Sequence, residues 1–144
     1  MNFIKIFIPL FVVGLLLSCS GKKGDMTNSD TEGLTLLNSV QVDHFNVGLF
    51  TESGEVSTGE NHIYIQVTKD KETLNDLEIN WHPIMSSMGH DCPHSEIKKT
   101  EGKKSLYNGT IDFTMSGNWE LTINFKNKSV SEKAMLKLDV KHLK

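Results

Sequence analysis

Apolar and polar residues alternate with a period of two through most of the chain after Leu34, and this alternation constrains the fold more than any other feature. Successive side chains of a β-strand point to opposite faces, so such a segment has one apolar face and one polar face. Each alternating run therefore predicts a half-buried antiparallel strand. The clearest runs are Ile63–Val67, Leu77–Trp81, Tyr107–Met115, Trp119–Phe125 and Leu136–Val140.

Turn-forming pairs separate these runs at short intervals, among them Ser53-Gly54, Glu101-Gly102 and Ser116-Gly117. The segment Val40–Phe50 adds one or two further strands. Seven or eight short strands, each with one apolar face, can bury those faces only in two stacked sheets or in a barrel. We predict an immunoglobulin-like antiparallel β-sandwich of seven or eight strands, with both tryptophans in its core.

The N-terminal segment has the features of a secretion signal. One positive charge, Lys5, precedes Ile6–Leu17, which is apolar apart from a proline and a glycine. About 12 residues cannot span a hydrocarbon core that needs roughly 20, so a signal is favoured over a membrane helix. The run ends in Leu16-Leu17-Ser18-Cys19, which resembles the lipobox that precedes a lipid-modified cysteine. The alternative is a plain secretory signal with an incidental cysteine.

This resemblance implies a lipoprotein signal peptide at residues 1–18 and lipidation of Cys19. Several acyl chains would anchor the mature chain stably to a membrane. The expected location is the cell envelope, facing the periplasm. Residues 19–33 are rich in Ser, Gly, Lys, Asp and Thr and predict a flexible tether. The remaining residues, 34–144, are enough for one domain.

Charge argues against nucleic acid as a partner. The chain has a net charge of −3 and no arginine, and its lysines are interspersed with acidic residues. A nucleic-acid-binding surface needs a basic stripe, and the Lys-Lys pairs are more simply solvated turns. An enzyme is not expected either, because no Ser-His-Asp set and no Gly-rich phosphate loop occurs. Cys92 lies two residues from His90 and from His94, which is a poor geometry for a catalytic dyad.

The cysteines carry more information. If Cys19 is lipidated, Cys92 is the only remaining thiol, and no disulfide can form within the mature chain. A lone thiol outside the cytoplasm is open to oxidation unless it is buried, paired with a partner or bound to metal. Cys92 is therefore either a small buried apolar residue or a ligand.

The stretch His82–His94 interrupts the alternation and contains two Met, three His and Cys92. Thioether, thiolate and imidazole groups are ligands that Cu(I) prefers, and Cys with His also suits Zn(II). Met88, His90, Cys92 and His94 are spaced by two, so a locally extended backbone would point all four to one side. The stretch predicts a copper site, with zinc as the alternative metal.

Strand direction suggests one further ligand. If consecutive strands run antiparallel, the chain returns through 96–98 and then 107–115, which brings Met115 to the same end of the sandwich as this loop. His44 should lie at the opposite end. The alternatives are that Met85 and Met115 are core residues, that His82 is a polar strand-end residue, and that His44, His62 and His142 are ordinary surface groups.

Two motifs resemble the YtkA-like family, which is related to FixH-type proteins. They are Met85-x-x-Met88-Gly89-His90 and the run Tyr107-x-Gly109-x-Ile111-x-Phe113-x-Met115-x-Gly117-x-Trp119-x-Leu121. The resemblance covers about Asn61 to Phe125. It implies a small extracytoplasmic immunoglobulin-like domain, often lipid- or membrane-anchored, with some members linked to copper handling or respiratory-oxidase assembly. The metal-site residues it implies are Met85, Met88, His90 and Met115, whereas Cys92 and His94 are not general to the family.

Two functions from different classes follow. The first is a copper-binding lipoprotein that stores Cu(I) or passes it to a copper exporter or an oxidase-assembly protein. The second is a metal-independent interaction module that scaffolds a membrane complex. A blue-copper electron carrier is a weaker third alternative, because the chain lacks the Cys-x-His-x-Met spacing and a distant first histidine ligand.

Overall fold

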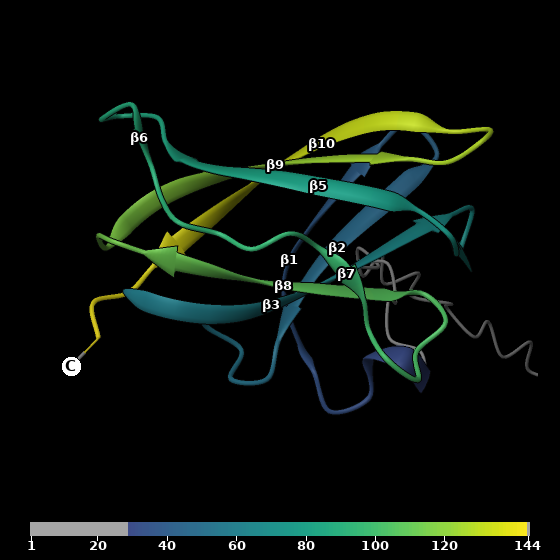
Figure 1. Ribbon diagram of the computed structural model, residues 1–144, viewed down its shortest axis with the longest axis horizontal. Coiled ribbons are helices and arrows are strands. Elements are labelled where there is room, and N and C mark those ends of the chain that lie inside the picture. Colours follow the sequence, from purple (N-terminus) through teal and green to yellow (C-terminus); the bar gives the residue numbers. More distant parts are fainter. Residues whose placement is uncertain (1–28, 144) are drawn as a thin grey trace, which may run out of the picture.

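The computed structural model describes residues 29–143, so the predicted signal peptide and Cys19 lie outside the described residues. Two antiparallel sheets stack face to face (Figure 1). The elements are η1 (Ser29–Thr31), β1 (Thr35–Val42), β2 (Phe45–Thr51), β3 (Gly59–Lys69), β4 (Glu72–Thr73), β5 (Glu78–Met85), β6 (His90–Asp91), β7 (Lys98–Lys99), β8 (Leu106–Phe113), β9 (Gly117–Lys126) and β10 (Ser131–Val140).

The larger sheet has the order β1-β2-β3-β8-β7, with β4 paired to β3, and the smaller sheet has the order β10-β9-β5-β6. The predicted antiparallel immunoglobulin-like sandwich is confirmed. The described residues form ten strands rather than seven or eight, because β4, β6 and β7 have only two residues each. Such short strands leave no periodic pattern in a sequence.

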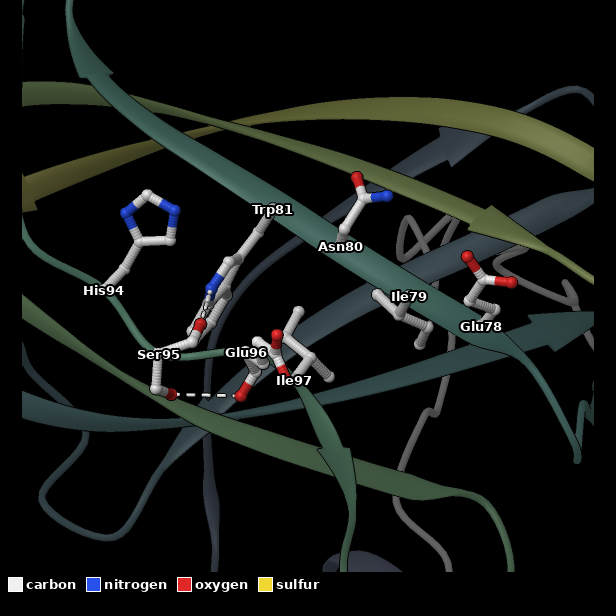
Figure 2. Close-up of a pocket in the computed structure, with 8 residues that line it drawn as sticks. All are labelled: Glu78, Ile79, Asn80, Trp81, His94, Ser95, Glu96 and Ile97. Carbon is white, nitrogen blue, oxygen red and sulfur yellow. Dashed lines mark hydrogen bonds between the residues drawn. The ribbon is translucent and has the colours of Figure 1, made fainter.

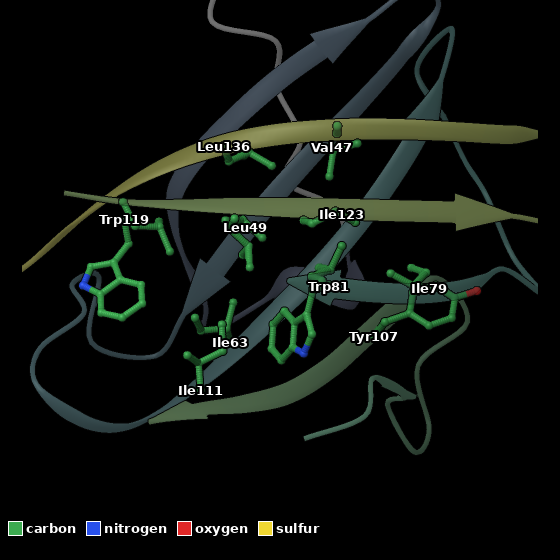
Figure 3. Close-up of a cluster of buried hydrophobic side chains, with 14 of the residues drawn as sticks. Val47, Leu49, Ile63, Ile79, Trp81, Tyr107, Ile111, Trp119, Ile123 and Leu136 are labelled. Atoms are coloured by element: carbon green, nitrogen blue, oxygen red, sulfur yellow. The ribbon is translucent and has the colours of Figure 1, made fainter. Parts of the chain in front are cut away.

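The predicted apolar faces form the core between the sheets (Figure 3). Along β9 every second residue is buried, from Trp119 through Ile123 to Phe125. The Trp119 ring is fully buried and meets Phe113 of the other sheet edge to face, with ring centroids 5.2 Å apart. Both tryptophans therefore lie in the core, as the alternation predicts.

Residues 92–97 connect the two sheets along one side of the sandwich (Figure 1). The chain leaves β6, and His94 forms an antiparallel bridge to Ile111 of β8. The Asp112 N–H donates to the Pro93 carbonyl at 2.9 Å. The chain then forms β7 and turns back into β8, which is the path expected from strand direction.

Trp81 and Gly109 fix this connection. The Trp81 indole Nε1–H donates to the Ser95 carbonyl at 2.8 Å, and the Ser95 hydroxyl accepts from the Thr110 N–H at 2.9 Å. A β-carbon at Gly109 would lie only 2.6 Å from Cζ2 of Trp81. Glycine in β8 therefore leaves room for an indole that reaches across from β5.

Residues 29–31, which lie within the stretch predicted as a tether, form η1 and make hydrogen bonds to the sandwich. The Asp30 carboxylate of η1 accepts hydrogen bonds from the Ser105 hydroxyl at 2.7 Å and from the Ser105 and Lys104 N–H groups. The Ser105 hydroxyl is the main reason that the pKa of Asp30 is lowered. These bonds attach η1 to the turn that precedes β8.

Candidate functional site

The hairpin of β5 and β6 contains three of the six predicted metal ligands, Met85, Met88 and His90. Its register pairs Met85 with His90 and Ile84 with Asp91. The Met88 N–H donates to the Met85 carbonyl at 3.0 Å and closes the turn. Gly89 has a φ of 60°, a left-handed conformation that glycine adopts without steric cost.

The six predicted ligands differ in burial. Met85 and Cys92 are each 5% exposed and belong to the core cluster, whereas Met88 is 65% exposed at the tip of the hairpin. Met115 is half-buried against the core, and His90 and His94 are exposed. The even spacing from Met88 to His94 therefore does not bring all four side chains to one side, because only His90 and Asp91 of this segment are in a strand.

The turn between β8 and β9 lies at the same end of the sandwich as this hairpin (Figure 1). A β-carbon at Gly117 would lie 3.4 Å from Cε of Met85. An open hollow of about 540 Å³ is lined jointly by the two turns, including Met85, Ser87 and Ser116. The main-chain oxygen of Met115 accepts the Trp119 Nε1–H bond at 3.0 Å.

His44 lies at the opposite end, as strand direction predicts. It occupies the turn between β1 and β2, where its carbonyl accepts from the Asp70 N–H at the end of β3. Its Nδ1 is 3.9 Å from an oxygen of the Asp70 carboxylate. This exposed histidine–carboxylate pair can be compared with the histidines at the hairpin end.

The Cys92 thiol lies in an environment that disfavours its ionisation. Burial, followed by the neighbouring negative charges of Asp91 and Asp112, raises the pKa of Cys92 to about 12. The thiolate is the form that binds metal or reacts, so Cys92 is an inert thiol near neutral pH. A metal ion that recruited it would have to displace its proton.

His82 and Asp91 were not among the predicted ligands, yet they lie beside His94. The Nδ1 atom of His82 is 3.8 Å from Oδ2 of Asp91, and both side chains are 52% exposed. The rings of His82 and His94 meet edge to face with centroids 6.4 Å apart. The sequence predicts His82 only as a polar residue at the end of a strand. It does not predict the approach of His94 to His82, because the bend that brings His94 back toward β5 has no periodic signature.

A shallow groove of about 440 Å³ adjoins His94, between β5 and residues 94–97 (Figure 2). Figure 2 shows the Trp81 indole reaching the Ser95 carbonyl in this groove, with the imidazole of His94 at one end. The groove carries both apolar and acidic side chains, including Ile79, Glu78 and Glu96.

Among residues 29–143, no three His, Cys, Asp or Glu side chains are arranged in this conformation to hold a metal ion. The same part of the chain contains no helix with the length and apolar character that a membrane span requires.

Comparison with known proteins agrees with the sandwich. The family model described as YtkA-like matches residues 39–124. A crystal structure of a DUF4426 family protein from Pseudomonas aeruginosa PAO1 has a similar fold, with a TM-score of 0.55 and 13% sequence identity, and the match covers 72% of this chain and 96% of that one. Curated proteins give no significant match. The match to the family model spans more than half of the sequence, and the chain therefore belongs to the YtkA-like family.

Proposed function

We propose that the protein is a lipid-anchored, extracytoplasmic copper-handling protein that binds Cu(I) at the β5–β6 end of its sandwich. The proposed ligands are Met88 and His90 of the hairpin and Cys92, which directly follows it, with Met85 and Met115 beside them. Such ligands suit Cu(I) better than they suit hard cations.

The exposure of Met88 carries this proposal. Methionine usually fills gaps in a core, and Met85, at 5% exposed, does so here. Met88 gains little from packing, because 65% of it faces solvent at the tip of the turn. A flexible thioether in that position, three residues from Met85 and two from His90, is available to a soft ion. An exposed ligand also allows the ion to pass to another protein.

The partner we propose is a copper exporter or an oxidase-assembly protein on the same membrane. Transfer between proteins requires ligands that a partner can reach and replace. Met88 and His90 are accessible, and the neighbouring hollow exposes the region around Met85 and Ser116. Cys92 would bind last, because its raised pKa means that a proton must leave before the thiolate can form.

The test is an anaerobic Cu(I) titration of the full chain, purified in detergent without a histidine tag, against a chromogenic Cu(I) chelator. We expect about one Cu(I) per chain. Met88→Leu keeps nearly the same volume and should weaken binding about tenfold or more, because it removes only the sulfur. His90→Ala and Met115→Leu should weaken it as well.

Met135→Leu is the matched control. Met135 is also an exposed methionine, at 49%, but it lies on β10, which contains none of the predicted ligands. His44→Ala serves the same purpose for His90. If Cu(I) binds no tighter than micromolar, or if Met135→Leu weakens binding as much as Met88→Leu, the copper proposal is wrong. The metal-independent interaction module would then be the better account.

The proposed anchor has its own test. Cys19→Ala should abolish incorporation of a labelled fatty acid and leave uncleaved precursor or released protein. Processed but unlabelled protein that stays on the membrane would contradict lipidation at Cys19.

A further inference from the structure

Three polar side chains gather on the outer surface beside the hairpin, apart from the sulfur groups. His82 comes from β5, Asp91 from β6, and His94 from the connection to the larger sheet. His82 Nδ1 faces Asp91 Oδ2 at 3.8 Å, and the two imidazole rings are 6.4 Å apart. The distance of 3.8 Å is too long for a hydrogen bond, which typically measures about 2.7–3.2 Å.

The backbone of Cys92 orients two of these side chains. Its N–H donates to Oδ1 of Asp91 at 2.7 Å, which leaves Oδ2 as the oxygen that faces His82. Its carbonyl lies 2.8 Å from Nδ1 of His94. Because a carbonyl only accepts, this contact requires a proton on Nδ1, so the lone pair of the neutral imidazole lies on Nε2. Metal-binding histidines are commonly oriented in this way through their other ring nitrogen.

The three groups lie close to the spacing that a shared metal ion would impose, but they do not yet match it. Zinc–nitrogen and zinc–oxygen bonds of about 2.0–2.2 Å place two ligand atoms roughly 3.3–3.6 Å apart at a tetrahedral angle. The 3.8 Å between His82 Nδ1 and Asp91 Oδ2 is slightly longer than this spacing. Two imidazoles on one tetrahedral ion would have ring centroids about 5 Å apart.

The separation of 6.4 Å between the His82 and His94 rings is longer than this. The three groups are therefore not in coordinating positions as they stand, and one ring has to turn to complete a site. Both histidines are exposed, and exposed side chains change rotamer within nanoseconds, so one ring can turn without a change in the backbone.

We propose that His82, Asp91 and His94 form a second metal site, which takes a divalent transition-metal ion such as Zn(II) or Cu(II). Imidazole and carboxylate groups suit these borderline ions, whereas the sulfur groups nearby suit Cu(I). This site uses none of the methionines and does not depend on the proposed Cu(I) function. In this proposal His94, whose ring contacts that of His82, binds a different ion from Met88.

The experiment is a calorimetric titration of the untagged full chain in detergent with Zn(II), under reducing conditions. Wild type should bind Zn(II) at this site, and His82→Ala, His94→Ala and Asp91→Asn should each weaken binding by about tenfold or more. His82→Gln, which keeps a polar side chain, should weaken it equally. Cu(II) bound to wild type should show nitrogen couplings from two imidazoles by electron paramagnetic resonance.

The His44–Asp70 pair is the matched control. It has almost the same histidine–carboxylate distance, 3.9 Å, at the opposite end of the sandwich. His44→Ala should leave Zn(II) binding unchanged, and so should Met88→Leu. Wild-type affinity in the His82 and His94 variants would overturn the proposal. Equal losses in His44→Ala or Met88→Leu would also overturn it, because the ion would then be held elsewhere. A failure of the Cu(I) site alone would leave these Zn(II) results unchanged.

Discussion

Replacing Gly109 with alanine tests the packing that holds the inter-sheet connection in place. Gly109 does not adopt the left-handed backbone conformation, so alanine is allowed at this position of β8. In an unstrained position, Gly→Ala usually stabilises a protein by about 0.4–1 kcal/mol. Here the new β-carbon would lie 2.6 Å from Cζ2 and 3.1 Å from Cη2 of Trp81. No carbon pair tolerates such contacts, so the indole must move.

The free-energy cost can be estimated from what the indole would lose. Overpacking a core costs about 1–3 kcal/mol. The hydrogen bond from Trp81 Nε1 to the Ser95 carbonyl contributes about 0.5–1.5 kcal/mol. After the usual gain from Gly→Ala is subtracted, we expect Gly109→Ala to lower the free energy of unfolding by about 1–4 kcal/mol, measured by urea denaturation followed through tryptophan fluorescence.

A double-mutant cycle identifies the cause. Trp81→Phe removes the part of the indole that contains Cζ2 and Cη2, so Gly109→Ala should cost much less in that background. Trp81→Phe is destabilising by itself. The double variant should nevertheless lose less unfolding free energy than the two single variants lose together, by more than about 1 kcal/mol. If Gly109→Ala stabilises the protein, or costs the same in both backgrounds, the proposed clash with Trp81 is not what requires glycine.

Two further predictions concern the core and the thiol. Trp119→Ala should lower the free energy of unfolding by about 3–5 kcal/mol, as expected for a fully buried large aromatic, and a loss under about 1 kcal/mol would contradict its place between the sheets. The pKa of Cys92 is raised in the folded chain, so folding favours the protonated thiol. This contribution to stability should be complete below the ordinary thiol pKa of 9.0 and be lost as pH rises toward about 12. Denaturation series at pH 7 to 10.5 would measure the difference in unfolding free energy between wild type and Cys92→Ala. This difference should shrink above pH 9. A constant difference would mean that the thiol ionises as freely in the folded chain as in the unfolded one.

Much of the fold could be predicted from the sequence, because strand alternation reports burial directly. In β9 and β10 the buried residues are the ones the period of two selects. The run ending at Met115 was predicted too long: β8 stops at Phe113, and Met115 lies in the turn that leads to Gly117. A polar–apolar pattern cannot distinguish the last residue of a strand from an apolar residue that packs beneath a turn.

The candidate site was predictable in composition but not in arrangement. Ligand types and strand direction were enough to bring Met115 to the end that carries Met85 and Met88. The sequence left open whether Cys92 is buried, and it did not predict the approach of His94 to His82, because both depend on how residues 92–95 bend onto β8. That bend is fixed by long-range hydrogen bonds such as Trp81 to Ser95, which leave no local signature.

The most direct test of the copper proposal is the X-ray absorption spectrum of the full chain loaded with one equivalent of Cu(I). The account predicts sulfur scatterers in the first coordination shell. Their contribution should fall in Met88→Leu and stay unchanged in Met135→Leu, since only Met88 belongs to the β5–β6 turn. A first shell of nitrogen and oxygen alone, or identical spectra for wild type and Met88→Leu, would contradict the account.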